Sequence, residues 1–96
     1  MKLRILSSGY SDLLRGKRFY DEQEEGIGDY FLEQLFLDID SLNHLAGSHR
    51  KTFGFHRMLS IRFPFAIYYK VMDDRILVYR VLDCRRNPTS IRNLLK

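Results

Sequence analysis

The spacing of apolar positions divides the chain into a mainly helical half and a mainly stranded half. Residues 2–7 alternate between apolar and polar side chains, which predicts a short strand. Residues 10–25 and 29–46 carry apolar side chains at three- and four-residue intervals, which predicts two helices. Because only a short glycine-containing loop, Gly26-Ile27-Gly28, joins them, we expect an antiparallel helical hairpin.

Each predicted helix has an apolar stripe that we expect to face the core. The first follows the three- and four-residue spacing of Tyr10, Leu13, Leu14, Lys17 and Tyr20, and Phe19 flanks it. The second is more nearly continuous and consists of Ile27, Phe31, Leu35, Ile39 and Leu42, widened by Leu32, Phe36 and Leu45. Asp29 and Glu33 lie near the start of the second helix, where the helix dipole favours negative charge.

From about residue 50 the apolar period changes to two, which predicts strands. Alternation around Phe53 and Phe55 is followed by runs over 58–63 and 65–71, then by a turn at Asp73-Asp74 and a run over 76–82. The last run is apolar at nearly every position, so we expect a central strand covered on both faces. Pro88 is placed to open a short helix over 89–95.

This order of elements predicts the fold class. A short strand, a helical hairpin, a mainly antiparallel sheet and a short terminal helix indicate one α+β domain over residues 1–96. The 45% of hydrophobic residues suffices for one modest core. The single cysteine, Cys84, forms no internal disulfide, and no apolar run approaches the ~20 residues of a membrane span. We therefore expect a cytoplasmic protein that does not enter the membrane.

The charge is distributed unevenly between the two halves. Residues 1–48 carry five Lys/Arg against nine Asp/Glu, a net charge of −4, and residues 49–96 carry eleven against three, a net charge of +8. Such asymmetry predicts that the second half faces an anionic partner, such as nucleic acid or an acidic protein segment. The alternative is that the two halves neutralise each other in the folded chain.

Several common kinds of site are disfavoured by the sequence. Gly26-Ile27-Gly28 follows a helix and lacks the Lys-Ser/Thr pair of a phosphate loop. The histidines, at 44, 49 and 56, lack the spacing and cysteine partners of a zinc site. Cys84 has no obvious histidine partner and is interpreted as a half-buried structural thiol. We expect neither a metal nor a cofactor.

The candidate functional residues are mainly basic side chains on the predicted strands or at their ends: Arg50, Lys51, Arg57, Arg62, Arg80, Arg85 and Arg86. A period-two count places Arg62 and Arg80 on a sheet face. Several arginines on one face form a cationic floor suited to phosphates. The alternative is a solvated outer face whose charges prevent aggregation.

Three segments of the chain resemble RelE/ParE-type toxins, also described as plasmid stabilisation proteins. Residues 57–71, RMLSIRFPFAIYYKV, are similar to the central hairpin of that family, which often contains Arg-Phe-Pro-aromatic followed by Ile-Tyr-Tyr. Residues 81–88, VLDCRRNP, resemble its last strand and exit. FYDEQ at 19–23, GIG at 26–28 and FL at 31–32 resemble its helical hairpin loop.

The resemblance implies the same α+β fold and a partner. The partner is a cognate antitoxin that forms a heteromeric complex with the toxin and blocks its active surface. An acidic or amphipathic antitoxin segment suits the basic second half. Exposed apolar positions on the helical hairpin, or beside Ile91, Leu94 and Leu95, are expected to receive an antitoxin helix.

The resemblance leaves two activities open. RelE-like members cut messenger RNA on the ribosome through attack of a 2′-hydroxyl on the adjacent phosphate, which requires proton transfer and cations. Here Arg57, Arg62, Arg85 and Arg86 would supply the cations. No general base is obvious, because the last tyrosine, Tyr79, lies inside the final strand and Asp83 replaces the family's histidine.

ParE-like members instead bind and poison DNA gyrase. The Arg-Phe-Pro-Phe-x-Ile-Tyr-Tyr segment over 62–69 is closer to this branch, so we favour the gyrase inhibitor over the ribosome-dependent endoribonuclease. Arg85, Arg86 and the terminal helix are the expected contacts with the target. A plain nucleic-acid-binding protein is a third hypothesis, which follows from the basic half alone.

Overall fold

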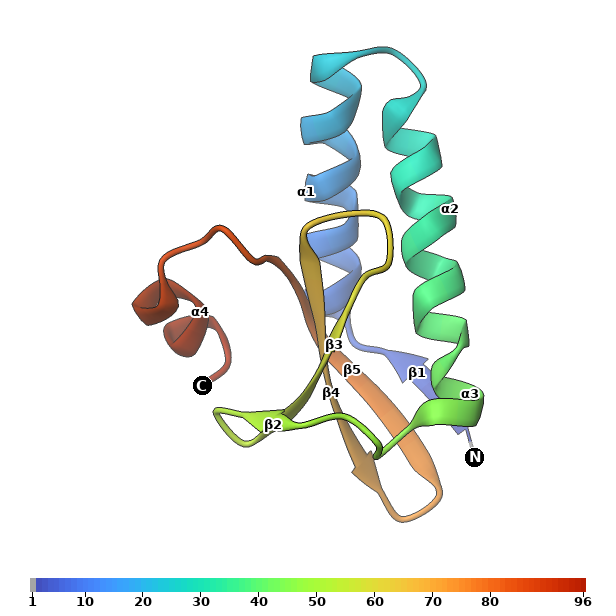
Figure 1. The fold of residues 1–96 in the computed structure, drawn as a ribbon, viewed down its shortest axis with the longest axis vertical. Coiled ribbons are helices and arrows are strands. Elements are labelled where there is room, and N and C mark those ends of the chain that lie inside the picture. The colour runs from blue at the N-terminus through green and yellow to red at the C-terminus, as the bar shows by residue number, and fades with distance from the viewer. Residues whose placement is uncertain (1) are drawn as a thin grey trace.

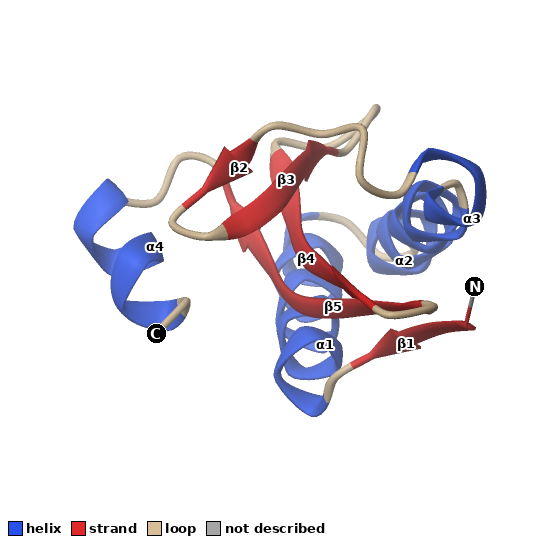
Figure 2. Cartoon of the chain, turned by 90° about the horizontal axis from the view of Figure 1, so that it is seen from below, coloured by secondary structure: helices blue, strands red, loops and turns tan. Residues whose placement is uncertain are grey.

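A five-stranded sheet separates a long helical hairpin from a short terminal helix in the computed structural model, which describes residues 2–96 (Figures 1 and 2). The elements are β1 Lys2–Ile5, α1 Ser7–Gln23, α2 Ile27–Asp40, α3 Leu42–Leu45, β2 Lys51–Thr52, β3 Phe55–Leu59, β4 Phe65–Met72, β5 Arg75–Asp83 and α4 Pro88–Leu94. The strand order is β1-β5-β4-β3-β2. The α+β fold class predicted from the sequence is therefore confirmed.

Strand β5 lies inside the sheet, as its continuous apolar run predicts. It pairs with β1 in parallel, with Ile5 opposite Val78, and with β4 in antiparallel. One of its faces contributes Val78 and Val81 to the core beneath the helical hairpin. The other contributes Leu82 to a second core that contains Ile91 of α4. Both faces are covered, which explains why few polar residues interrupt this strand.

The main core is built on the stripe predicted for the second helix. Phe31, Leu35, Ile39 and Leu42 are 0–2% exposed and pack against the sheet. The stripe is narrower than predicted, because Phe36 and Leu45 are 40% and 47% exposed. The helix also begins earlier than predicted, and α2 ends at Asp40 before the short α3.

Helix α1 buries a face that matches the predicted stripe only in part. Its buried residues are Gly9, Asp12, Leu13 and Gly16, whereas Tyr10 and Leu14 are 49% and 55% exposed. The two glycines allow the helix to approach its neighbours closely: a Cβ at Gly9 would lie 3.4 Å from two carbonyl oxygens of β5. Of the predicted stripe, Leu13 is 1% exposed and Tyr20 packs against the core, but the rest of the buried face is backbone and a carboxylate rather than large apolar side chains. The helix also begins at Ser7 rather than residue 10.

Residues 60–64 form a loop instead of the predicted continuation of a strand. Ile61, inside the strand predicted over 58–63, is 86% exposed. The amide of Ser60 donates to the carbonyl of Phe65 at 2.8 Å and so closes the turn between β3 and β4. Pro64 has no amide to donate to a sheet ladder, and β4 begins only at the next residue, Phe65. Arg62 consequently lies on an exposed loop rather than on a sheet face.

Within residues 2–96, none of the helices has the length and apolar character needed to cross a bilayer.

Candidate functional site

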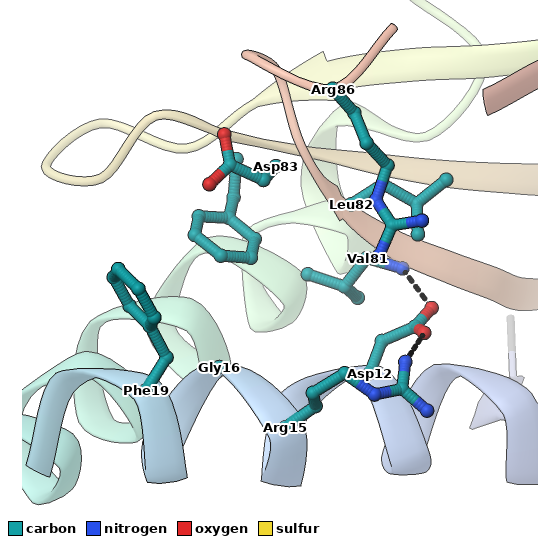
Figure 3. A pocket seen from close by; sticks show the side chains of 9 residues that line it. Asp12, Arg15, Gly16, Phe19, Val81, Leu82, Asp83 and Arg86 are labelled. Atoms are coloured by element: carbon teal, nitrogen blue, oxygen red, sulfur yellow. Dashed lines mark hydrogen bonds and ion pairs between the residues drawn. The ribbon is translucent and has the colours of Figure 1, made fainter. Parts of the chain in front are cut away.

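The end of β5 is held against α1 by the carboxylate of Asp12, whose side chain is 2% exposed. This carboxylate accepts hydrogen bonds from Arg80 Nε at 2.8 Å, Arg80 Nη2 at 2.7 Å and the Val81 amide at 2.9 Å. Arg15 Nη1 lies 3.2 Å from the same group, and Figure 3 shows Asp12 between Arg15 and Val81. Arg80, predicted as a binding residue, is thus fixed in an internal ion pair.

Arg85 closes on Asp83 immediately after β5. Its backbone amide and Nε donate to Asp83 Oδ1 at 2.8 and 2.9 Å, and its Nη2 donates to Oδ2 at 2.6 Å. The hydrogen bonds from Arg85 lower the pKa of Asp83, and partial burial opposes this effect. The Asp83 carboxylate in turn raises the pKa of Arg85. The Arg85 side chain is 61% exposed, so the pair remains accessible to a partner.

The Arg57 side chain, on β3, lies on the face of the sheet that packs against α4, opposite the face that carries the helical hairpin. Its Nε donates to the hydroxyl of Tyr68 at 3.2 Å, and its Nη2 lies 3.6 Å from the Cys84 sulfur. Tyr68 is 1% exposed and is part of the second core. Cys84 is half-buried.

The four arginines predicted for a nuclease are carried by segments that meet at one end of the sheet. The Cys84 amide donates to the carbonyl of Pro64 at 2.8 Å, which places the loop containing Arg62 beside the segment containing Arg85. The side chains nevertheless have separate partners. Arg86 donates to Ser90 Oγ at 3.3 Å, Arg85 is bound to Asp83, and Arg57 is bound to Tyr68.

Arg50 and Lys51 lie at the far edge of the sheet. Lys51 is exposed on β2, and strands β3 and β4 separate β2 from β5. Arg50 is also exposed, and its carbonyl accepts a hydrogen bond from the Arg57 amide at 3.0 Å. The predicted basic residues therefore do not form a single continuous cationic floor.

The three apolar residues predicted to receive an antitoxin helix pack against the chain itself. Ile91 and Leu95 are 7% and 8% exposed, and Leu94 is half-buried beside them. Together they attach α4 to the second core. In this conformation the helix covers a sheet face that would otherwise be apolar and exposed.

A polar network around Tyr69 was not found by sequence reasoning. The Tyr69 hydroxyl bonds to Nδ1 of His49 and accepts the Gly47 amide at 3.1 Å. His56 stacks on the Tyr69 ring with centroids 5.1 Å apart, and its Nδ1 donates to the His49 carbonyl at 2.6 Å. Burial, and secondly the charge of His56, lower the pKa of His49. The network fastens the segment before β2 to the sheet, a role that histidine spacing alone does not reveal.

Asp12 was also missed by the sequence reasoning, although the sequence contains a signal for it. Asp12 lies three and four residues from Gly9 and Gly16, so the three share one side of the helix. A small-residue face of this kind indicates close backbone packing. Among residues 2–96, no group of three or more His, Cys, Asp and Glu side chains is arranged to hold a metal ion.

The arrangement of a short parallel edge strand, a helical hairpin, an antiparallel sheet and a terminal helix defines a ParE-like fold. The chain is similar to a chain in a solved structure described as "Chromosomal ParDE TA system from P. aeruginosa", with a TM-score of 0.77 and 16% sequence identity. The match covers 84% of this chain and 92% of that chain. No protein-family model and no curated protein sequence matches the chain. At this identity the likeness establishes the fold, and it agrees with the fold implied by the sequence resemblance.

Proposed function

We propose that this chain is the toxin component of a toxin–antitoxin pair and acts in the cytoplasm until a cognate antitoxin neutralises it. The observation that carries the proposal is the similarity to a ParDE chain over most of both chains. The segments at 57–71 and 81–88 support it independently, because they resemble the same superfamily at the level of sequence. Since a fold alone does not fix an activity, the target is argued from the site.

The favoured target is DNA gyrase, inhibited through surface contact. RNA cleavage requires cations and a proton acceptor arranged around one phosphate. Here Arg57 is bound to Tyr68 on the face of the sheet that packs against α4, whereas Arg85 is bound to Asp83, which lines a pocket against α1. The Tyr68 residue is 1% exposed, so its hydroxyl is poorly placed to reach a substrate. This arrangement supports a binding protein over the endoribonuclease.

The test combines induced expression in a bacterial host with primer extension on a reporter messenger RNA and with a gyrase supercoiling assay on the purified chain. We expect growth arrest and lost supercoiling without new cuts inside codons. Arg86→Ala should relieve both effects, whereas Arg75→Ala, at an exposed arginine at the opposite end of β5, serves as the control. New cuts abolished by Arg86→Ala would instead support the endoribonuclease.

Neutralisation is tested separately by co-expressing the chain with the product of the gene adjacent to its own. The proposal predicts that the two proteins co-purify and that growth is restored. Growth arrest that no adjacent gene product relieves would contradict the toxin–antitoxin assignment and leave the growth effect standing.

A further inference from the structure

A small cavity opens between α1 and the end of β5, with a volume of about 160 Å³ (Figure 3). Its apolar walls come from three elements: Phe19 on α1, Phe65 on β4, and Val81 on β5. Phe19 is 46% exposed, so the mouth presents an aromatic ring to the surroundings. This is an apolar pocket inside the otherwise charged region around Arg86.

The size of the pocket limits what it can hold. An apolar cavity of ~150 Å³ accommodates a benzene-sized group, whereas sites for whole small molecules usually measure ~300–1,000 Å³. The pocket therefore fits one aromatic or large aliphatic side chain and not a complete ligand. Such a pocket is typical of the anchor positions of protein interfaces, where one buried side chain contributes much of the affinity.

The charged residues at the rim of the pocket determine which kind of group on the partner fits beside the bound side chain. The two carboxylates that line the pocket are already occupied: Asp12 by Arg80, and Asp83 by Arg85. Two further arginines also line it. The Arg15 side chain is 61% exposed and contacts Asp12 only at 3.2 Å.

The second of these rim arginines, Arg86, donates to the neutral hydroxyl of Ser90 at 3.3 Å. With both carboxylates satisfied, Arg15 and Arg86 give the rim a net positive charge. Guanidinium groups bind carboxylates through short, charge-assisted hydrogen bonds. The rim is thus complementary to an acidic group on the occupant.

We propose that this pocket receives one aromatic or large aliphatic side chain of a partner protein segment, with an adjacent carboxylate of that segment held by Arg15 and Arg86. The proposal rests on the proposed function, because the partner is the neutralising antitoxin. It assigns the antitoxin segment an apolar residue beside an acidic one. It also gives Phe19 and Arg15 a role that neither sequence patterns nor the resemblance supplied.

The experiment titrates the isotope-labelled chain with N-acetyl-phenylalanine, which combines an aromatic side chain with a carboxylate, and follows backbone amide shifts by NMR. We expect shifts confined to the surroundings of Gly16, Phe19 and Val81, with a dissociation constant of about 1–10 mM for a fragment of this size. N-acetyl-phenylalanine amide, which lacks the carboxylate, should bind about 10-fold more weakly. Equal binding of acid and amide, or no shift at these residues, would overturn the proposal.

Variants separate the two parts of the pocket. Arg15→Gln/Arg86→Gln should weaken binding of the acid about 10-fold and leave the amide unaffected. Phe19→Ala should weaken both probes, and Arg18→Gln, an exposed arginine of α1 outside the pocket, should weaken neither. Loss of binding in Arg18→Gln to the same extent as in the double variant would reject the specific clamp.

A second measurement places the partner in the pocket. The affinity of the purified chain for its antitoxin should fall at least about 10-fold in Phe19→Ala and in Arg15→Gln, and not in Arg18→Gln. Fragment binding with an unchanged antitoxin affinity would reject the antitoxin as occupant. Fragment binding and toxicity are measured independently of each other. Growth arrest by a chain that does not bind the fragment would reject only the pocket. Fragment binding by a chain that does not arrest growth would reject the proposed function.

Discussion

Asp12 and Arg80 lie 68 positions apart in the chain and form a two-point ion pair between α1 and β5, with Nε–Oδ2 and Nη2–Oδ1 distances of 2.8 and 2.7 Å. Their side chains are 2% and 17% exposed. The Val81 amide adds a third hydrogen bond to the same carboxylate. Because these contacts link the helical hairpin to a central strand, they determine where the end of β5, and every arginine that follows it, lies relative to α1.

Asp12→Ala is expected to destabilise the chain by ~3–5 kcal/mol, because it leaves the partly buried Arg80 charge without its anionic partner and the buried Val81 amide without an acceptor. Replacing both members of the pair, as in Asp12→Leu/Arg80→Met, should cost less than the sum of the single changes. Urea unfolding followed by circular dichroism measures both. Asp29→Ala is the control: its side chain is 81% exposed and 3.6 Å from Lys17, so a change within ~0.5 kcal/mol is expected. Equal losses at the two aspartates would show that the buried pair does not contribute as described.

Gly16→Ala tests the close contact between the two long helices. A Cβ at this position would lie 2.6 Å from two ring atoms of Phe31, which is 0% exposed and cannot move freely. Helix propensity alone would favour alanine by ~1 kcal/mol, but overpacking a core costs ~1–3 kcal/mol. We expect the melting temperature to fall, and Phe31→Leu to restore part of it in the double variant. A rise in melting temperature on Gly16→Ala would contradict this geometry.

Those parts of the fold that depend on large apolar side chains were predictable from the sequence. The stripe through Phe31, Leu35 and Ile39 identified the buried face of α2, because burial of such side chains dominates helix packing. The continuous apolar run over 76–82 identified a central strand for the same reason. The α+β class followed from the change of period between the two halves.

The parts of the fold and of the candidate site that the sequence did not predict depend on contacts between residues far apart in the chain. The buried face of α1 contains Gly9, Asp12 and Gly16, none of which a hydrophobic pattern detects. The basic residues of the candidate site were identifiable by type, but their partners were not. Whether Arg80 is free or bound depends on Asp12, and the exposure of Arg62 depends on the turn closed at Ser60.

The network around Tyr69 predicts a specific dependence of stability on pH. The pKa of His49 is lowered from 6.5 in the folded chain, chiefly by burial, so the unfolded chain binds a proton more readily. Its contribution to stability is therefore fully present above about pH 6.5 and is lost as the pH falls through the folded pKa. Protonation also removes the acceptor at Nδ1 for the Tyr69 hydroxyl.

The measurement compares the urea midpoint at about pH 7.5 and about pH 5.5 for the wild-type chain and for His49→Gln. The wild-type chain should lose stability at the lower pH, and His49→Gln should lose less. His44→Gln is the control, because His44 is exposed. The same pH slope in wild type and His49→Gln would assign the dependence to other groups.

Tyr68→Phe removes a single hydroxyl group and distinguishes the gyrase-inhibitor hypothesis from the endoribonuclease hypothesis. The Tyr68 hydroxyl accepts the Arg57 Nε hydrogen bond at 3.2 Å inside the second core. If that hydroxyl only positions Arg57, its removal should cost ~1 kcal/mol of stability and leave gyrase inhibition within about 3-fold of wild type. If instead it assisted proton transfer, RNA cleavage would fall ~100-fold or more. Tyr10→Phe, at a tyrosine that is 49% exposed, controls for the general effect of losing a phenol. A 100-fold loss of toxicity in Tyr68→Phe, with folded protein at wild-type levels and cuts in messenger RNA that disappear with it, would overturn the gyrase assignment.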